Sequence, residues 1–272
     1  MNTPRDDGIT AQRVRAHYDR VSKWSSLLCG EHIHQGYWEG IGSIKEAQER
    51  LIARLASFAQ IFPGAAVLDV GCGLGGSAFW LAEHLGCSVL GITNSCKQAG
   101  LAMKSCRARR LEDNVRFAVL DANILNVATA SFDVVWTLEC AEHLSAREHF
   151  IQNCLGLLKR DGRFAFGGWA IPEQDLRLSQ QALLDQLCSA MLCHEPDRLS
   201  DYVCWLKSSK LTNIVAQDWT ENVRQTAAEW ARTLENRLVR LFLRFSDPRG
   251  SPKGVVRLSK LTEPAPCGMS PV

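Results

Sequence analysis

Short apolar runs alternate with helical stretches from Pro63 onward, and this alternation is the strongest pattern in the chain. It is typical of repeated strand–helix–strand units around a parallel sheet. It predicts strands at residues 66–70, 88–92, 115–120, 132–137 and 163–169, and helices at residues 75–85, 96–110 and 146–158. Because crossovers between parallel strands are right-handed, we expect an α/β fold with a Rossmann-like, doubly wound, mostly parallel sheet. Its ligand crevice would lie at the carboxyl ends of the strands.

The segments on either side of these units are predicted to be mainly helical. Residues 1–60 are expected to form an N-terminal helical cap, in which Val14, Tyr18, Val21 and Trp24 recur at helical spacing. Within the main domain, residues 61–245, the pattern predicts a helical lid at 173–210, a sixth strand at 213–219 and an amphipathic helix at 229–245. The proline-containing residues 246–272 are predicted to be a disordered tail.

Composition and charge exclude several classes of protein. A net charge of +2, from 31 Lys and Arg against 29 Asp and Glu, leaves no chain-wide basic footprint for nucleic acid. No apolar run approaches the roughly 20 residues of a membrane span, and residues 1–12 lack the apolar core of a signal peptide. The eleven cysteines are odd in number and form no Cys-x-x-Cys pair. We therefore expect reduced thiols, a cytoplasmic location and no metal site.

The sharpest motif is a glycine-rich turn between a predicted strand and a predicted helix, Val67-Leu68-Asp69-Val70-Gly71-Cys72-Gly73-Leu74-Gly75-Gly76. Glycines there allow a ligand to approach the backbone closely, and the ligand could be a dinucleotide or S-adenosylmethionine. A dinucleotide site needs an acidic residue about 20 positions further on, where this chain has Gly91-Ile92-Thr93-Asn94-Ser95. Asp69 would repel a diphosphate but could accept a hydrogen bond from an ammonium group. The motif therefore favours S-adenosylmethionine.

This motif resembles the first motif of the class I S-adenosylmethionine-dependent methyltransferases. The similarity extends from about His17 to Trp219, and it is greatest to the tocopherol C-methyltransferase-like enzymes, relatives of the sterol methyltransferases and cyclopropane synthases. Three further segments carry it, namely Trp24-Ser25 through Gly30-Glu31-His32-Ile33-His34-Gln35-Gly36-Tyr37-Trp38, then Gly91 to Ser95 with Gln98, and Leu138-Glu139-Cys140-Ala141-Glu142-His143. The glycine motif is specific only to the superfamily, whereas these three segments in this order are much more specific.

The resemblance implies a set of residues that bind S-adenosylmethionine. They are Asp69, Gly71, Cys72 and Gly73 around the methionine moiety, Thr93, Asn94 and Gln98 near the ribose, Asp121 and Ala122 at the adenine, and Tyr18, His34 and Glu139 closing the site. An acid is absent from the end of the second strand, which matches this subfamily.

His143 is the predicted general base, because it follows the fourth strand at the crevice and an imidazole titrates near neutral pH. It could instead cap a helix that begins near Ser145. Glu139 and Glu142 are the other candidate catalytic residues, since they could orient the imidazole or bind a cationic acceptor; solvation at the surface is an equal alternative for Glu142. In the cyclopropane-synthase branch, the resemblance implies that the glutamate of the Glu-His pair helps to hold bicarbonate.

Several aromatic residues indicate the chemical character of the methyl acceptor. Tyr37, Trp38, Trp169 and Trp205 are expected to line the crevice, which suits a lipophilic small molecule. We expect a methyltransferase acting on an O, N or C atom of such a molecule, in specialised metabolism. The alternatives are a cyclase or pericyclase that uses the cofactor without consuming it, and a non-catalytic cofactor-binding protein.

Two features of the C-terminal part leave further questions open. The helix at 229–245 has arginines beside an apolar stripe and could touch a membrane surface, although such a helix more often covers a sheet. The resemblance also implies a closing antiparallel pair of strands, but residues 246–272 offer only the weak run Gly254-Val255-Val256-Arg257-Leu258. The state of that sheet edge and the oligomeric state cannot be read from the sequence.

Overall fold

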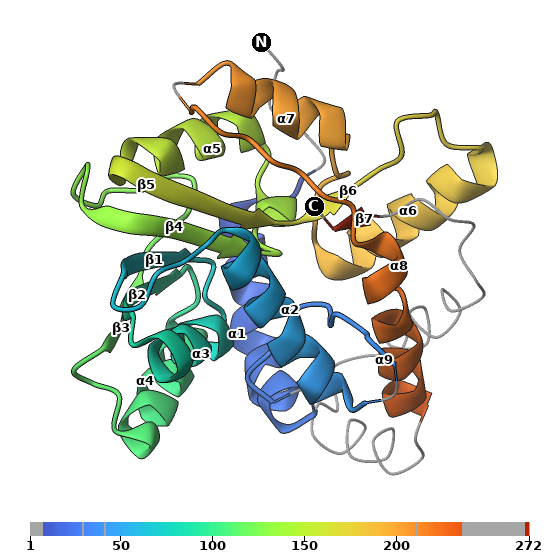
Figure 1. Ribbon diagram of the computed structural model, residues 1–272. Coiled ribbons are helices and arrows are strands. Elements are labelled where there is room, and N and C mark those ends of the chain that lie inside the picture. Colours follow the sequence, from blue (N-terminus) through green and yellow to red (C-terminus); the bar gives the residue numbers. More distant parts are fainter. Residues whose placement is uncertain (1–7, 29, 41, 210, 236–269, 272) are drawn as a thin grey trace.

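A five-stranded parallel sheet forms the centre of the molecule (Figure 1). The computed structural model describes residues 8–28, 30–40, 42–209, 211–235 and 270–271. The strands are β1 (Ala66–Val70), β2 (Ser88–Thr93), β3 (Val115–Val119), β4 (Phe132–Leu138) and β5 (Leu158–Gly167), in the order β3-β2-β1-β4-β5. The order reverses at β1, which pairs with both β2 and β4. The predicted doubly wound fold is confirmed, and only β5 begins well ahead of its predicted start.

Helices cover both faces of the sheet (Figure 1). On one face, α2 (Ile44–Phe58) and α3 (Gly76–Leu85) pack on a hydrophobic core that includes Val67, Val134 and Trp136. On the other face, α5 (Arg147–Gly156) and α7 (Leu199–Lys207) pack against Leu68 and Val135. Neighbouring residues of β1 and β4 thus point to opposite cores, which is why these strands read as continuous apolar runs.

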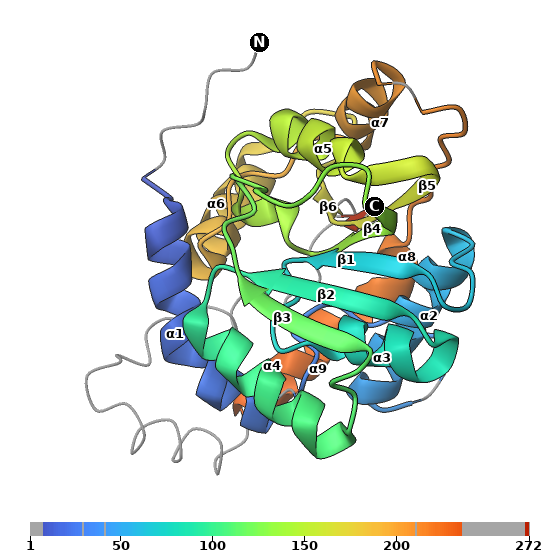
Figure 2. The ribbon, with the colours of Figure 1, turned by 90° about the vertical axis from the view of Figure 1, so that its left-hand side faces the viewer.

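The cap helix α1 (Ala11–Leu28) lies beside α4 (Cys96–Arg109) at the carboxyl edge of the sheet (Figure 2). Asp19 joins the two helices, because its Oδ1 accepts hydrogen bonds from Ser95 Oγ at 2.5 Å and from Lys97 N at 3.1 Å. Ser95 is the N-cap of α4, so a carboxylate of α1 sits at the positive end of the α4 dipole. This contact holds the cap over the strand ends.

The segment predicted to be a helical lid, residues 173–210, contains two helices. They are α6 (Leu178–Met191) and α7, and a 3-10 turn, η1 (Ala141–His143), connects β4 to α5 beneath them. The short strand β6 (Trp169–Ala170) pairs antiparallel with β7 (Ser270–Pro271), so two residues of the predicted tail lie in a strand pair. The remainder of that tail, residues 246–269 and 272, lies outside the described residues.

The predicted sixth strand at residues 213–219 is wrong. This segment has no regular structure in the part that the structure describes, and Val215 is exposed. Its end is fixed by Trp219, whose ring packs edge-on against Tyr37 at 5.6 Å and against Phe58 at 5.8 Å. An aromatic side chain in the core therefore anchors the segment. The apolar residues that suggested a strand form no ladder with any of the described strands.

Two short helices follow this segment. They are α8 (Thr220–Val223) and α9 (Gln225–Glu235), so the structure describes only the first part of the predicted helix at 229–245, and residues 236–245 lie outside it. Among the described helices, none is both long and apolar enough to cross a membrane.

Thr226 of α9 fastens the C-terminal helices to the cap loop, by which we mean residues 30–38. Its Oγ1 accepts hydrogen bonds from Gly36 N at 2.9 Å and from Trp38 Nε1 at 2.8 Å, and the side chain is fully buried. Trp38 N also donates to Asn222 O at 2.8 Å. One hydroxyl thus satisfies two buried donors.

We expect Thr226→Val to lower the free energy of unfolding by about 2–4 kcal/mol, because valine keeps the shape but leaves two buried N–H groups unpaired. Urea unfolding measures this loss. Thr129→Val, on an exposed loop, is the matched control and should change the free energy by no more than about 0.5 kcal/mol. Equal effects of the two substitutions would contradict the role of Thr226.

Candidate active site

The turn after β1 brings two loops into direct contact. Gly71 has φ +79° and its N–H donates to Ile92 O at 2.9 Å. A Cβ built on Gly71 would lie 2.4 Å from Sγ and 2.5 Å from Cβ of Cys140, which follows β4. Only glycine can combine this left-handed backbone conformation with so close a neighbour. The carboxyl ends of β1 and β4 therefore meet at Gly71.

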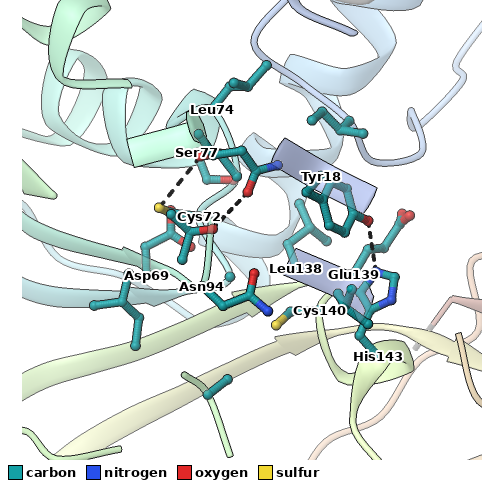
Figure 3. A pocket seen from close by; sticks show the side chains of 18 of the residues that line it. Tyr18, Asp69, Cys72, Leu74, Ser77, Asn94, Leu138, Glu139, Cys140 and His143 are labelled. Carbon is teal, nitrogen blue, oxygen red and sulfur yellow. Dashed lines mark hydrogen bonds between the residues drawn. The ribbon is translucent and has the colours of Figure 1, made fainter. Parts of the chain in front are cut away.

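A cavity opens at these strand ends (Figure 3). It is lined by every residue that the sequence assigned to the cofactor, namely Tyr18, His34, Asp69, Gly71, Cys72, Gly73, Thr93, Asn94, Gln98, Asp121, Ala122 and Glu139. His143 lies on the same lining. Segments from the cap, from the turns after β1 to β4 and from the end of η1 thus meet at one site.

Asp69 and His34 supply polar atoms that lack partners within the described chain. Asp69 Oδ2 is buried and accepts no hydrogen bond there, and burial raises the pKa of this carboxyl to about 7. His34 donates from Nδ1 to Gln35 O at 2.7 Å, which leaves Nε2 as a buried acceptor. Burial lowers the pKa of His34 to about 4, so the ring is neutral. A buried polar atom without a partner is costly, and a bound ligand with an ammonium group and hydroxyl groups fits both acceptors.

The side of the cavity formed by the turns after β2 and β3 is ordered by hydrogen bonds among its own residues. Thr93 Oγ1 donates to Gln98 Oε1 at 2.7 Å, and Gln98 N donates to Ser95 Oγ at 3.0 Å. Both Thr93 and Gln98 are buried. Asp121 Oδ1 accepts from Asn123 N at 2.9 Å, which fixes the turn after β3. These side chains are therefore positioned before any ligand binds.

The cap loop is held against the cavity from three sides. Gln48 of α2 donates to His32 O at 3.1 Å and to His34 O at 2.8 Å. Arg109 of α4 pairs with Glu31 at 2.5 Å between Nη2 and Oε2. His32 packs so closely on α3 that a Cβ on Gly76 would lie 2.4 Å from its Nδ1. His32 does not line the cavity, whereas Glu31 and His34 do.

Tyr18 and His143 form a hydrogen-bonded pair at one end of the cavity (Figure 3). His143 Nδ1 lies 2.9 Å from Leu192 O, and because a carbonyl only accepts, Nδ1 carries the proton. Burial lowers the pKa of His143 to about 4, so its Nε2 bears a lone pair, and Tyr18 Oη donates to it at 2.8 Å. Burial and the nearby acidic groups raise the pKa of Tyr18, so the phenol keeps its proton at neutral pH.

Glu139 and Glu142 are tied to backbone N–H groups. Glu139 Oε1 accepts from Gln35 N at 2.8 Å and so connects the cap loop to the end of β4. Glu142 Oε1 accepts from Trp169 N at 2.7 Å. Burial and then Glu142 raise the pKa of Glu139 to about 8, and burial also raises the pKa of Glu142. Glu139 lines the cavity, whereas Glu142 lies behind it and is not solvated at the surface.

The four aromatic residues predicted to hold the acceptor do not line this cavity. Tyr37 and Trp38 are buried between the cap loop and the C-terminal helices, Trp205 packs on Tyr202 at 5.3 Å, and Trp169 lies beside Glu142. Their contact with an acceptor stays a prediction.

Several residues of the lining escaped the sequence analysis. Ala11 and Val14 of α1, Ser77 of α3, and Cys140 and Leu144 around η1 complete the cavity wall. Ser77 could have been found from its place in the first turn after the glycine motif, but the others carry no chemical signal. In the part of the chain that the structure describes, no group of three or more His, Cys, Asp or Glu side chains is placed to hold a metal ion.

Comparison with known families gives the site its context. The family model for mycolic acid cyclopropane synthetase matches residues 7–247. The chain belongs to this family. The family depends on S-adenosylmethionine, which is thus the cofactor of this chain.

Two curated relatives of this family member carry out methyl transfer to different atoms. The chain is 31% identical over 228 residues to the chloroplastic tocopherol O-methyltransferase of Arabidopsis thaliana, covering 77% of this chain and 66% of that protein. It is 28% identical over 229 residues to norajmaline N-methyltransferase of Rauvolfia serpentina, covering 78% of each. The chain therefore spans less than two thirds of the length of the first relative.

Solved structures show the same fold. The [4+2]-cyclase SpnF superposes with a TM-score of 0.79 at 22% identity, covering 96% of this chain and 94% of that one. Geranyl diphosphate C-methyltransferase from Streptomyces coelicolor, in complex with S-adenosyl-L-homocysteine, gives 0.72 at 15% identity, covering 99% and 97%. This family member therefore has the fold of S-adenosylmethionine-dependent methyltransferases.

We expect Gly71→Ala to weaken binding of S-adenosylhomocysteine at least tenfold, because the added Cβ must displace Cys140 from the cavity wall. Calorimetric titration measures the dissociation constant. Gly64→Ala is the matched control, since Gly64 has the same φ of +79° but nothing within 4 Å of its Cβ. Both variants should lose about 1 kcal/mol of stability to the left-handed conformation, and only Gly71→Ala should lose affinity. Equal affinities would mean that the Cys140 contact is unimportant.

The raised pKa of Glu139 predicts a pH-dependent gain in stability for Glu139→Gln. A carboxyl whose pKa rises from 4.5 to about 8 on folding stabilises the fold fully below about pH 4.5, and this stabilisation is lost as pH rises through 8. Glutamine keeps the acceptor for Gln35 N without the charge. The free energy of unfolding of the variant, relative to the unaltered protein, should therefore increase between pH 5 and 8.5 in urea titrations without ligand. The exposed Glu148→Gln should show a constant difference, and a constant difference for Glu139→Gln would contradict the assignment.

Proposed function

We propose that this protein transfers a methyl group from S-adenosylmethionine to an oxygen or nitrogen atom of a lipophilic small molecule, and that this atom carries a proton. The observation behind the proposal is the Tyr18–His143 hydrogen bond of 2.8 Å on the lining of the cofactor cavity. The bound cofactor supplies an electrophilic methyl group on a sulfonium centre. Everything else that methyl transfer needs is alignment, exclusion of water and removal of one proton.

The pair is arranged to remove that proton. An acceptor O–H or N–H can give its proton to the oxygen of Tyr18 while the phenolic proton passes to His143 Nε2. The resulting imidazolium keeps its Nδ1–H bond to Leu192 O. The raised pKa of Tyr18 prevents the phenol from ionising before the acceptor is in place. His143 is thus the base, Tyr18 the group that contacts the acceptor, and Glu139 a buried neighbour that fixes the cap loop.

The surroundings support a lipophilic acceptor. The cavity wall near Tyr18 includes Val14, Leu138 and Leu144, and both relatives named above act on largely apolar molecules by their names, a tocopherol and norajmaline. We propose a phenol or a secondary amine of comparable size as the acceptor. We also propose that the protein works in the cytosol, since all nine described cysteines are free thiols.

The test is an acceptor panel with S-adenosylhomocysteine release as the readout. Tocopherol-type phenols, hydroxylated polyketides and indole secondary amines would be compared with matched tertiary amines and alkenes that have no O–H or N–H. Release with the first group alone is expected. Conversion of a compound without any S-adenosylhomocysteine would instead indicate a cyclase, and release with proton-free acceptors would contradict the proposed proton transfer.

For the active acceptor, we expect Tyr18→Phe and His143→Gln to lower kcat by about 10²–10⁴-fold, the range typical of a lost general base. The dissociation constant for S-adenosylhomocysteine should change little, because Tyr18→Phe keeps the aromatic ring on the cavity wall and neither substitution alters the glycine turn. His149→Gln, on the exposed side of α5, is the control and should retain full activity. Full activity of both Tyr18→Phe and His143→Gln would overturn the proposed roles.

A further inference from the structure

Arg147 is a buried cation at the first turn of α5, with only 3% of its surface exposed. Its guanidinium reaches back to η1, where Nε donates to Ala141 O at 2.9 Å and Nη2 approaches Glu142 O at 3.4 Å. The turn that carries His143 is therefore held from below by one side chain. An arginine in this position is costly to bury unless all its N–H groups are satisfied.

The same guanidinium also holds the segment that connects α6 to α7. Nη1 donates to Glu195 O at 2.9 Å and to Asp197 Oδ2 at 2.6 Å, and Nη2 donates to His194 O at 3.1 Å. Asp197 is itself nearly buried. The planar fork thus bonds two separate stretches of chain, residues 141–142 and residues 194–197, at fixed distances.

His143 bridges these two stretches. Its ring belongs to η1, while its Nδ1–H donates to Leu192 O, the C-cap of α6 and only two residues before His194. A second bond runs parallel, from His194 N to Glu142 O at 2.8 Å. The separation between the imidazole and the Leu192 carbonyl is therefore set by the two stretches that Arg147 clamps.

We propose that Arg147 is a positioning residue for methyl transfer, because it keeps the Leu192 carbonyl in place and thereby selects the Nδ1–H tautomer of His143. In that tautomer the Nε2 lone pair faces Tyr18. With the other tautomer, Nε2 would carry a hydrogen and could not accept the phenolic proton. This inference deepens the proposed role of the Tyr18–His143 pair and rests on it.

A purely structural role would have a different consequence. If Arg147 only stabilised the fold through its ion pair with Asp197, variants would unfold more easily but His143 would keep its tautomer in the folded protein. The ring nitrogen signals of histidine distinguish the two tautomers directly, and they need no acceptor molecule. The failure of this inference is therefore separable from failure of the proposed function, which the acceptor panel and Tyr18→Phe test by activity.

The experiment uses the full chain labelled with ¹⁵N-histidine at pH 7.5, with and without S-adenosylhomocysteine. The His143 signals are assigned by their disappearance in His143→Gln. Arg147→Lys keeps the positive charge but loses the fork, so it cannot span both stretches. We expect the unaltered protein to show His143 as the Nδ1–H form alone, and Arg147→Lys to show a mixture of both tautomers. The dissociation constant of Arg147→Lys for S-adenosylhomocysteine should stay within about twofold of that of the unaltered protein.

Ile151→Val is the matched control, since Ile151 lies one turn further along α5 and is also buried. The substitution costs about 0.5–1.5 kcal/mol of stability and removes no hydrogen bond to η1. It should keep the single tautomer. If Arg147→Lys fails to fold, Asp197→Asn is tested in its place, because it weakens the contact of Arg147 with residues 194–197. A mixture of both His143 tautomers is again expected. A single Nδ1–H form in the folded Arg147 or Asp197 variant would overturn the inference.

Discussion

The contact between the turns that follow β1 and β4 is the constraint on which the site depends. These strands are adjacent only because the strand order reverses at β1, and their carboxyl ends converge where a side chain on Gly71 would strike Cys140. Asp69 of β1 and Cys72 on the turn after it are thereby placed on one cavity wall with Glu139, Cys140 and His143. The cofactor end and the proposed proton-transfer end of the site are thus fixed by the same backbone contact.

The cap completes this site from the opposite direction. Asp19 fastens α1 to the start of α4, and the neighbouring residue, Tyr18, reaches across the cavity to His143. Because a helix is stiff over one turn, the position of Tyr18 follows from that of Asp19. Attachment of the cap and placement of the Tyr18–His143 pair therefore depend on the same helix, α1.

The sequence was sufficient to predict the sheet and the residues that meet at the cavity, because both depend on local signals. The strand predicted at residues 66–70 matches β1 at both ends. The glycines after it indicate directly a turn with left-handed backbone conformations. Prediction failed where tertiary contacts decide. Residues 213–219 have the composition of a strand, but the segment is positioned by Trp219, whose ring packs against Tyr37 and Phe58 in the core. Leu192, whose carbonyl sets the His143 tautomer, carries no side-chain signal at all.

Burial shifts four ionisable groups of the cavity lining in the same sense, toward the neutral form. It lowers the pKa of His34 and His143 to about 4 and raises the pKa of Asp69 to about 7 and of Glu139 to about 8. At neutral pH, His34 and His143 are therefore neutral, and Glu139 is mostly protonated. A cationic cofactor changes this balance, because a positive charge favours ionisation of Asp69 while it further disfavours protonation of His143. A cation bound in this cavity would thus favour both the carboxylate form of Asp69 and the neutral form of His143.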